Sequence, residues 1–150
     1  MVDELGFRIA VGLGLTVGAI VVHVIGSGVL LMIVRRNMRH IHHARPWRIQ
    51  IPVLMALMLG LVLLHAVEIA GFALAYLGVG AVPDLETALY FSTASYATVG
   101  HGDLVAAPWR LLGAWEGLIG FILIGWSTAL FLAVILRIWS EDHRWFEPRE

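Results

Sequence analysis

Three long apolar runs constrain this chain more than any other feature of its sequence. Residues 9–34 contain no acid, lysine or arginine, and residues 51–77 and 111–136 each contain a single glutamate. A helix needs about 20 apolar residues to cross a bilayer. The composition agrees, because 59% of the residues are hydrophobic and only 14% are charged, whereas soluble domains are nearer half apolar and a quarter charged. The sequence therefore predicts three transmembrane helices at residues 9–34, 51–77 and 111–138.

A fourth, shorter stretch lies between the second and third runs. Residues 84–97 are moderately apolar but too few to cross a bilayer as a helix. A short helix can enter the membrane and turn back where protein covers it. We expect an all-α membrane protein with one membrane domain over residues 1–150, in which this re-entrant helix joins the second and third spans.

The arginines predict the orientation of the chain. The positive-inside rule makes the link of residues 35–50 cytoplasmic, because it carries five arginines, whereas residues 78–110 carry only Arg110. The N-terminus is then outside, the re-entrant helix enters from outside, and the tail of residues 139–150 is cytoplasmic. We expect a multi-pass protein of the plasma or inner membrane. The five arginines of the link are Arg35, Arg36, Arg39, Arg45 and Arg48.

Several function classes lack support in this sequence. The chain has no cysteine, which excludes disulfides, thiol catalysis and thiolate metal sites. It also has no recognisable nucleophile–base arrangement and no His-Glu-x-x-His metal motif. We expect neither an enzyme nor a nucleic-acid partner.

A glycine-rich hexapeptide, residues 98–103, directly follows the predicted re-entrant helix. Its two glycines, Gly100 and Gly102, alternate with other residues and can take backbone angles denied to those residues. A strand that alternates between left- and right-handed conformations can aim successive carbonyls the same way. Four copies around an axis would stack rings of oxygen dipoles that replace the hydration shell of a cation, and the negative end of the preceding helix dipole would favour that cation.

The hexapeptide Thr-Val-Gly-His-Gly-Asp and the stretch Ala-Leu-Tyr-Phe-Ser at residues 88–92 resemble the filter and pore helix of the potassium-channel pore-loop family. That family usually has Thr-Val-Gly-Tyr-Gly-Asp in its filter. The third run is similar to the inner helix of bacterial inward-rectifier-like channels, and its resemblance rests on Glu116, Gly120, Ser127 and Thr128. The resemblance covers about residues 83–136, takes the second span as the outer helix, and leaves the first span outside.

The resemblance implies a potassium-selective ion channel subunit that permits passive permeation as a homotetramer. Potassium would be bound by the carbonyls of Thr98, Val99, Gly100 and His101 and by the Thr98 hydroxyl. Gly102 would complete the filter and Asp103 would lie at its outer mouth. No cofactor is expected other than potassium ions in the filter.

His101 departs from the family pattern, which has Tyr or sometimes Phe there. A neutral imidazole that packs the filter is one reading, and a pH-sensitive filter is the other, because histidine titrates near neutral pH. The alternatives are therefore a weakly selective or pH-gated monovalent cation channel, and a non-conducting membrane scaffold with a channel-like fold.

Glu116, Glu68 and His65 are ionisable residues within the predicted second and third spans. Such residues usually face a partner or water. We expect Glu116 to support the filter through hydrogen bonds, and Glu68 with His65, one turn apart on the second span, to join that network. The alternative is that Glu68 and His65 pair only with each other, or that Glu68 reaches the headgroups.

Gly120 falls where the family has its gating-hinge glycine, and close helix packing is the alternative role. Arg35, Arg36 and Arg39 lie beyond the end of the first span, so we expect topology and contact with anionic lipid rather than voltage sensing. His40, His42 and His43 extend that patch, and metal binding or internal pH sensing there is a minor alternative. The sequence identifies neither the gating stimulus, the role of the first span, the organism nor any partner subunit.

Overall fold

The computed structural model describes residues 2–38, 46–100, 105 and 107–140, and all its regular structure is helical. The hexapeptide is therefore described as far as Gly100. In chain order the elements are α1 (Val2–Met38), α2 (Pro46–Gly78), α3 (Leu85–Tyr96), the 3-10 turn η2 (Ala107–Trp109) and α4 (Arg110–Ser140).

Three of these helices are long and apolar enough to cross a membrane. The candidate spans are Glu4–Asn37 in α1, Gln50–Gly78 in α2 and Arg110–Ile138 in α4, which confirms the prediction of three long apolar helices. Each helix extends beyond its apolar run, because the flanking polar residues continue the backbone hydrogen bonding. Pro52 lies within the second turn of α2, and because proline has no N–H, the helix forgoes one backbone hydrogen bond at that point.

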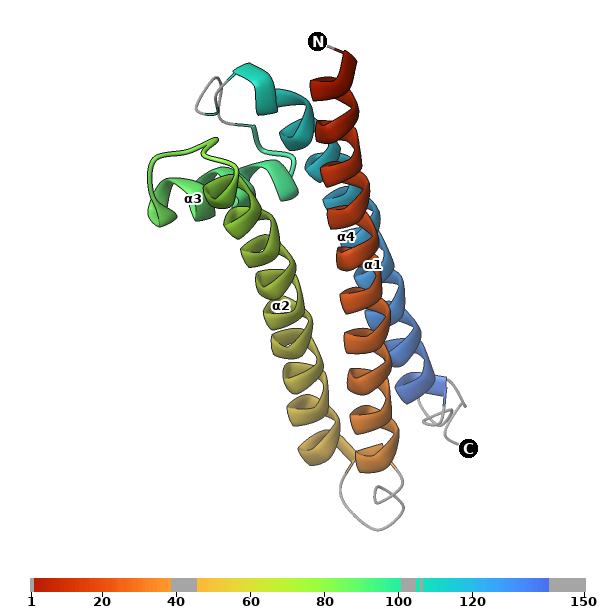
Figure 1. Cartoon of the computed structure of the whole chain (residues 1–150). Helices are drawn as coiled ribbons and strands as arrows, with labels where there is room; N and C mark the ends of the chain where they lie inside the picture. Colours follow the sequence, from red (N-terminus) through yellow and green to blue (C-terminus); the bar gives the residue numbers. More distant parts are fainter. Residues whose placement is uncertain (1, 39–45, 101–104, 106, 141–150) are drawn as a thin grey trace, which may run out of the picture.

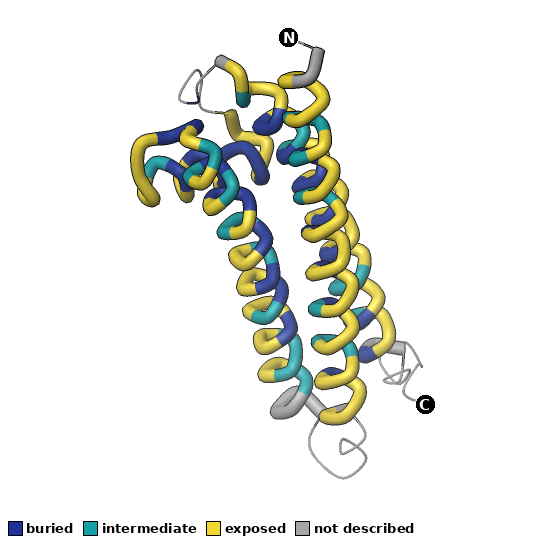
Figure 2. The backbone as a smooth tube through the Cα atoms, viewed as in Figure 1, coloured by how far each residue is buried: buried dark blue, intermediate teal, exposed yellow. Residues whose placement is uncertain are grey.

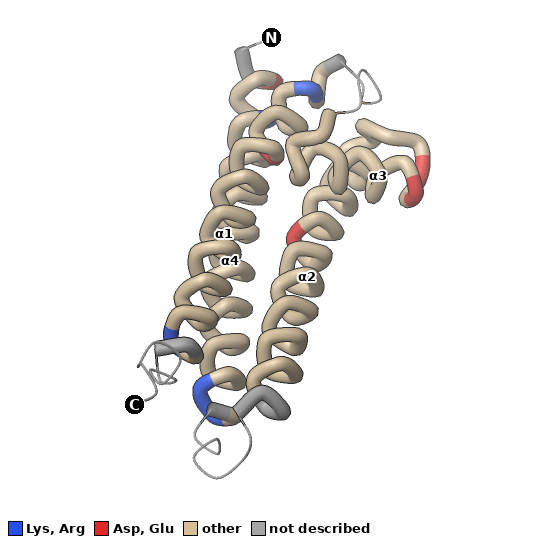
Figure 3. The backbone as a smooth tube through the Cα atoms, turned by 180° about the vertical axis from the view of Figure 1, so that it is seen from behind, with Lys and Arg blue, Asp and Glu red and all other residues tan. Residues whose placement is uncertain are grey.

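The short helix α3 lies across one end of α2, while the three long helices run side by side (Figure 1). The N-terminus of α1 lies at the same end of the molecule as α3. Arg35 and Arg36, in the last turn of α1, and Arg137, in the last turn of α4, lie at the opposite end (Figure 3). The end with Arg35, Arg36 and Arg137, which we call the arginine-rich end, has three described arginines in its helix ends, while the end that carries α3 has Arg8 and Arg110.

Exposed residues run along all three long helices (Figure 2), and many of them are large and apolar. Leu63 is 67% exposed and Phe121 is 68% exposed. Water would penalise such a continuous apolar surface, and lipid would not.

The core near α3 combines residues from all four helices, with Ala19, Phe72, Phe91 and Ile119 among its members. A second core at the arginine-rich end joins α1, α2 and α4.

The first span, whose role the sequence left open, packs against both other spans. Gly26 of α1 faces Leu64 of α2, and Gly60 of α2 faces Leu30 of α1. Each helix therefore places a glycine against a leucine of the other. Small residues of this kind let membrane helices approach closely. On the α4 side, the Gly12 position lies against Leu112, and a Cβ added there would be 3.5 Å from that side chain.

Candidate functional site

The start of α3 is fixed by a side-chain cap. Asp84 has an extended backbone (φ −152°, ψ 167°) and accepts hydrogen bonds from the Thr87 backbone N–H at 2.8 Å and from the Thr87 hydroxyl at 2.9 Å. An aspartate in this position satisfies one of the free N–H groups of the first turn. The backbone N–H bond from Thr87, followed by the hydroxyl bond, lowers the pKa of the Asp84 carboxyl below its ordinary value.

The end of α3 is closed by two backbone hydrogen bonds that belong to a Schellman motif. The Thr98 N–H donates to the Ser95 carbonyl at 2.9 Å, and the Val99 N–H donates to the Ala94 carbonyl at 3.0 Å. This motif requires a left-handed residue directly after the helix cap, usually glycine. The residue here is Thr98, with φ 58°.

Two left-handed residues alternate with Val99 at the start of the hexapeptide. Thr98 has φ 58° and Gly100 has φ 77°. The left-handed region is a genuine outlier for a β-branched residue, and such strain is held only where the surroundings enforce it. The alternating backbone predicted for the hexapeptide is thus present in its described part, although its first left-handed residue is a threonine rather than a glycine.

Glu116 lies on α4 and contacts both α3 and α2. Its side chain is fully buried, its Oε1 lies 2.5 Å from the Ser92 hydroxyl, and its Oε2 accepts a 2.7 Å hydrogen bond from the Tyr76 hydroxyl. The Ser92 hydroxyl also lies 2.8 Å from the Ile69 carbonyl. These hydroxyls and Glu116 link the middle of α3 to the two helices beside it, and we call them the Glu116 cluster.

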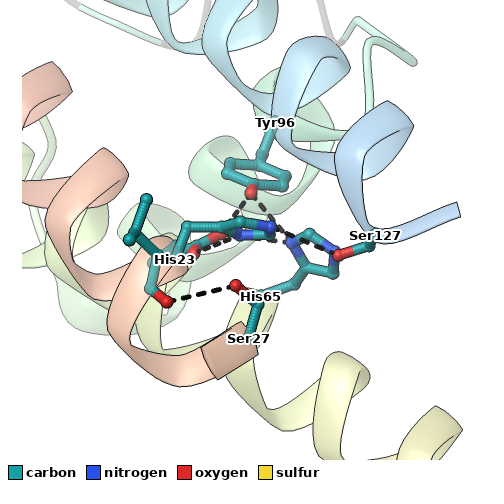
Figure 4. Close-up of polar contacts among 7 residues, drawn as sticks. His23, Ser27, His65, Tyr96 and Ser127 are labelled. Carbon is teal, nitrogen blue, oxygen red and sulfur yellow. Dashed lines mark hydrogen bonds and ion pairs between the residues drawn. The ribbon is translucent and has the colours of Figure 1, made fainter. Parts of the chain in front are cut away.

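A separate group of polar side chains surrounds Glu68, and Figure 4 labels its members His23, His65, Tyr96 and Ser127. His23 Nδ1 lies 2.8 Å from Glu68 Oε1, His65 Nδ1 lies 3.1 Å from Oε2, and the Tyr96 hydroxyl donates to Oε2. His23 Nε2 lies 3.5 Å from the Ser127 hydroxyl. We call these residues the Glu68 cluster, and it joins α1, α2, α3 and α4.

The sequence analysis named Glu116, Glu68 and His65 as members of one network. The structure distributes them between two clusters that contact α3 at different points, through Ser92 and through Tyr96. It also adds His23 and Tyr96, which the sequence analysis missed. The lone histidine in the first apolar run was the available signal for His23, since ionisable residues in membrane spans usually have partners.

Gly120, the predicted hinge, lies against the end of α3. A Cβ added at Gly120 would collide with the Tyr96 carbonyl oxygen and lie 2.9 Å from the Tyr96 carbonyl carbon. The glycine therefore permits close approach of the α4 backbone to the last residue of α3.

A cleft of about 610 Å³ opens between α3 and α4 on the side of the hexapeptide. Phe91, Ser95 and Thr98 line one wall, and Gly113, Gly117 and Phe121 line the other. The described hexapeptide residues are exposed here, and Val99 exposes 77% of its surface. An exposed valine next to an open cleft is a surface that another chain could cover.

Several predicted residues lie outside the described part of the chain. These are His101, Gly102 and Asp103 of the hexapeptide, together with Arg39, His40, His42 and His43 of the link. Their predicted roles remain predictions.

Comparison with known proteins gave one match at the family level. The sequence model of a family described as ion channel matches residues 47–137, from the start of α2 to the last turn of α4. No curated protein and no solved structure matched the chain. The matched segment contains α2, α3, the hexapeptide and α4 and covers more than half of the chain, so this membrane protein, built from three long apolar helices and one short helix, belongs to the ion channel family.

Proposed function

We propose that this chain is one subunit of a potassium-selective channel, in which α3 is a re-entrant pore helix and residues 98–103 form the filter. The carbonyls of Thr98, Val99, Gly100 and His101 and the Thr98 hydroxyl bind potassium, Gly102 completes the filter, and Asp103 lies at the outer mouth. Four subunits assemble around the ion path, since each chain supplies one filter segment.

The observation that carries this proposal is the alternating left-handed backbone at Thr98 and Gly100, directly after the end of α3. Alternation of this kind turns successive carbonyls toward one side, and rings of carbonyls can replace the hydration shell of a cation. The position of the hexapeptide after the C-terminal end of α3 also favours cation binding, because that end carries the negative end of the helix dipole.

The strained threonine supports the same reading. Glycine would close α3 without steric cost, yet the chain has a β-branched residue there. A threonine side chain carries a hydroxyl that glycine lacks, and this hydroxyl is an additional oxygen ligand for a cation. The exposed Val99 supports assembly, since neighbouring subunits would cover it.

The separation of charge in the fold supports an orientation. Arg35, Arg36 and Arg137 lie at the end opposite α3, so the positive-inside rule places α3 and the N-terminus outside and the C-terminus in the cytoplasm. Contact of Arg35 and Arg36 with anionic lipid follows from the same placement. The membrane is the plasma or inner membrane of the cell.

Gly120 is also our proposed gating hinge. Its contact with Tyr96 couples any bending of α4 to the end of the pore helix. The two buried clusters support the filter from behind, because each ends on a side chain of α3.

The test is potassium-driven flux in liposomes that hold the purified protein, with sodium as the paired ion. We expect flux with potassium and little with sodium. The variant Gly100→Ala forces a side chain into a left-handed position (φ 77°) and is expected to abolish this flux. Gly80→Ala is the matched control, since Gly80 also has a positive φ (64°) and open space around it but lies outside the hexapeptide.

The His101 departure favours a second candidate, a weakly selective or pH-gated monovalent cation channel. Equal flux of potassium and sodium, with selectivity gained in His101→Tyr, would support that candidate. Absence of flux for both ions at several pH values, from intact tetramers, would contradict conduction and favour a channel-like scaffold.

A further inference from the structure

We propose that His23, His65 and Glu68 form a binding site for a divalent transition-metal ion of the zinc class. The site lies inside the helix bundle, between α1 and α2 and next to the last residue of α3 (Figure 4). It is distinct from the hexapeptide, and it does not depend on ion conduction by the channel.

The ligand set is the first argument. One ligand atom from each of the three side chains lies within 4.8 Å of the other two. Two imidazoles and one carboxylate suit zinc and its neighbours, whereas magnesium and calcium prefer an all-oxygen set. His65 and Glu68 are three residues apart and therefore share one face of α2, and His23 approaches them from α1.

The geometry is close to that of a bound ion. Zinc lies about 2.0–2.2 Å from nitrogen and oxygen ligands, so two ligands of a tetrahedral ion are about 3.3–3.5 Å apart. His23 Nδ1 lies 2.8 Å from Glu68 Oε1, and His65 Nδ1 lies 3.1 Å from the other oxygen, Oε2. Side-chain rotations that bring the two imidazole nitrogens and a carboxylate oxygen to the spacing of zinc ligands would admit the ion.

Burial supplies the driving force for a cation. The side chains of His23 and Glu68 are both fully buried, and an ionised carboxylate away from water needs a cation or several hydrogen bonds. In the part of the chain that the structure describes, the ion-pair partners of Glu68 are the two histidines. The His65 side chain is 17% exposed, so it lies at the edge of the cluster.

Surrounding polar groups can orient the ligands. With the ion on Nδ1, the proton of His23 would lie on Nε2, which faces the Ser127 hydroxyl at 3.5 Å. Metal-bound histidines usually donate their other ring N–H to such a partner. The Tyr96 hydroxyl contacts Glu68 and lies 2.9 Å from His65 Nδ1, so it is placed to hold the carboxylate or to complete the coordination.

The experiment is a metal titration of the purified full-length protein, carried out with an affinity tag that contains no histidine. Zinc binding is measured by calorimetry, and cobalt is used as a probe because a tetrahedral cobalt site has intense visible absorption. We expect one zinc per chain and a tetrahedral cobalt spectrum. His23→Gln and Glu68→Gln are each expected to weaken zinc binding at least tenfold.

The chain has five other histidines, and three of them lie close together in the link, where they could bind zinc themselves. The triple variant His40→Ala/His42→Ala/His43→Ala is therefore the matched control, and it should keep the site and its cobalt spectrum. Loss of binding in this variant, or unchanged binding in both His23→Gln and Glu68→Gln, would overturn the proposal.

A variant with a damaged fold is recognised by its tryptophan-fluorescence melting curve, and in that case the partly exposed position is used instead. His65→Ala removes a ligand at the edge of the cluster and is expected to weaken zinc binding at least tenfold. Unchanged zinc affinity in a folded His65→Ala protein would also overturn the proposal.

Discussion

The C-terminal ends of α2 and α3 use the same backbone motif with different residues. At the end of α2 the Gly80 N–H donates to the Leu77 carbonyl at 3.1 Å, and the Ala81 N–H donates to the Tyr76 carbonyl at 2.9 Å. At the end of α3 the corresponding bonds come from Thr98 and Val99. The left-handed residue is a glycine in α2 (φ 64°) and a threonine in α3 (φ 58°).

The two helix ends also differ in their surroundings, since the α2 end is open and the α3 end is packed against other helices. Gly80 has open space around the position of a Cβ, and its relaxed turn needs no support. The end of α3 is held from two sides, by the Tyr96 hydroxyl on Glu68 and by the close approach of Gly120 to the Tyr96 carbonyl. A left-handed threonine costs about 1–3 kcal/mol and persists only where its surroundings enforce it. The strained conformation of Thr98 therefore occurs at the helix end whose last residue, Tyr96, is held by neighbouring helices.

Removal of the strongest support should have the largest effect. Glu68→Ala removes the carboxylate that contacts His23, His65 and Tyr96. His23 and Tyr96 are buried, and because a buried polar group that loses its partner costs about 1–3 kcal/mol, we expect a loss of about 2 kcal/mol or more in stability, measured by tryptophan-fluorescence melting in detergent. Glu86→Ala, an exposed site on α3, is the control. Equal melting of the two variants would mean that the Glu68 cluster does not support α3.

The second support is tested by Gly120→Ala. The added methyl group would collide with a backbone carbonyl that cannot rotate away, and overpacking of this kind typically costs about 1–3 kcal/mol. Gly125→Ala on the same helix meets nothing within 4 Å and should be neutral or gain up to about 1 kcal/mol of helix propensity. The same melting assay compares them, and a Gly120→Ala protein as stable as Gly125→Ala would refute the close-packing role.

The third prediction places a threonine, the residue found at the end of α3, in the left-handed position at the end of α2. Gly80→Thr places a β-branched residue at φ 64° without any supporting contact, and we expect a loss of about 1–2 kcal/mol in stability. Gly78→Thr is the control, because Gly78 also has open space but no positive φ. If the two variants melt alike, the left-handed conformation carries no cost here.

The reverse substitution, Thr98→Gly, should separate stability from function. Relief of the strain is offset by the higher unfolded-state entropy of glycine, about 0.5–1 kcal/mol, so stability should stay the same or rise slightly. We expect potassium flux or selectivity to fall, because the hydroxyl is lost, and Thr98→Ser should preserve both. Wild-type selectivity in Thr98→Gly would remove the hydroxyl from the proposed filter.

The smallest effect is expected at the start of α3. The pKa of Asp84 is lowered by its bonds from Thr87, so its stabilising contribution is present above the unfolded-state value near 3.8 and is lost as the pH falls through the folded value. Asp84→Ala should melt slightly below the wild type at pH 7, and the difference should vanish at acid pH. Asp84→Asn keeps a capping oxygen but no charge, so it should melt between the wild type and Asp84→Ala at pH 7.

The sequence alone predicted the three long helices, the short helix between the last two, and the glycine-rich segment after it. These features are local, since the length of an apolar run and the spacing of glycines do not depend on distant residues. The family match to residues 47–137 agrees with the part of the chain that the resemblance had covered.

Only the tertiary structure decided which faces of the helices meet. The three long helices are apolar on nearly every side, so their sequences do not indicate an inward face. His23 meets Glu68 from 45 positions away, and Tyr76 meets Glu116 from 40 positions away. The left-handed Thr98 could not be foreseen either, because local preference opposes it, and the contacts that hold the end of α3, from Glu68 and Gly120 to Tyr96, come from distant parts of the chain.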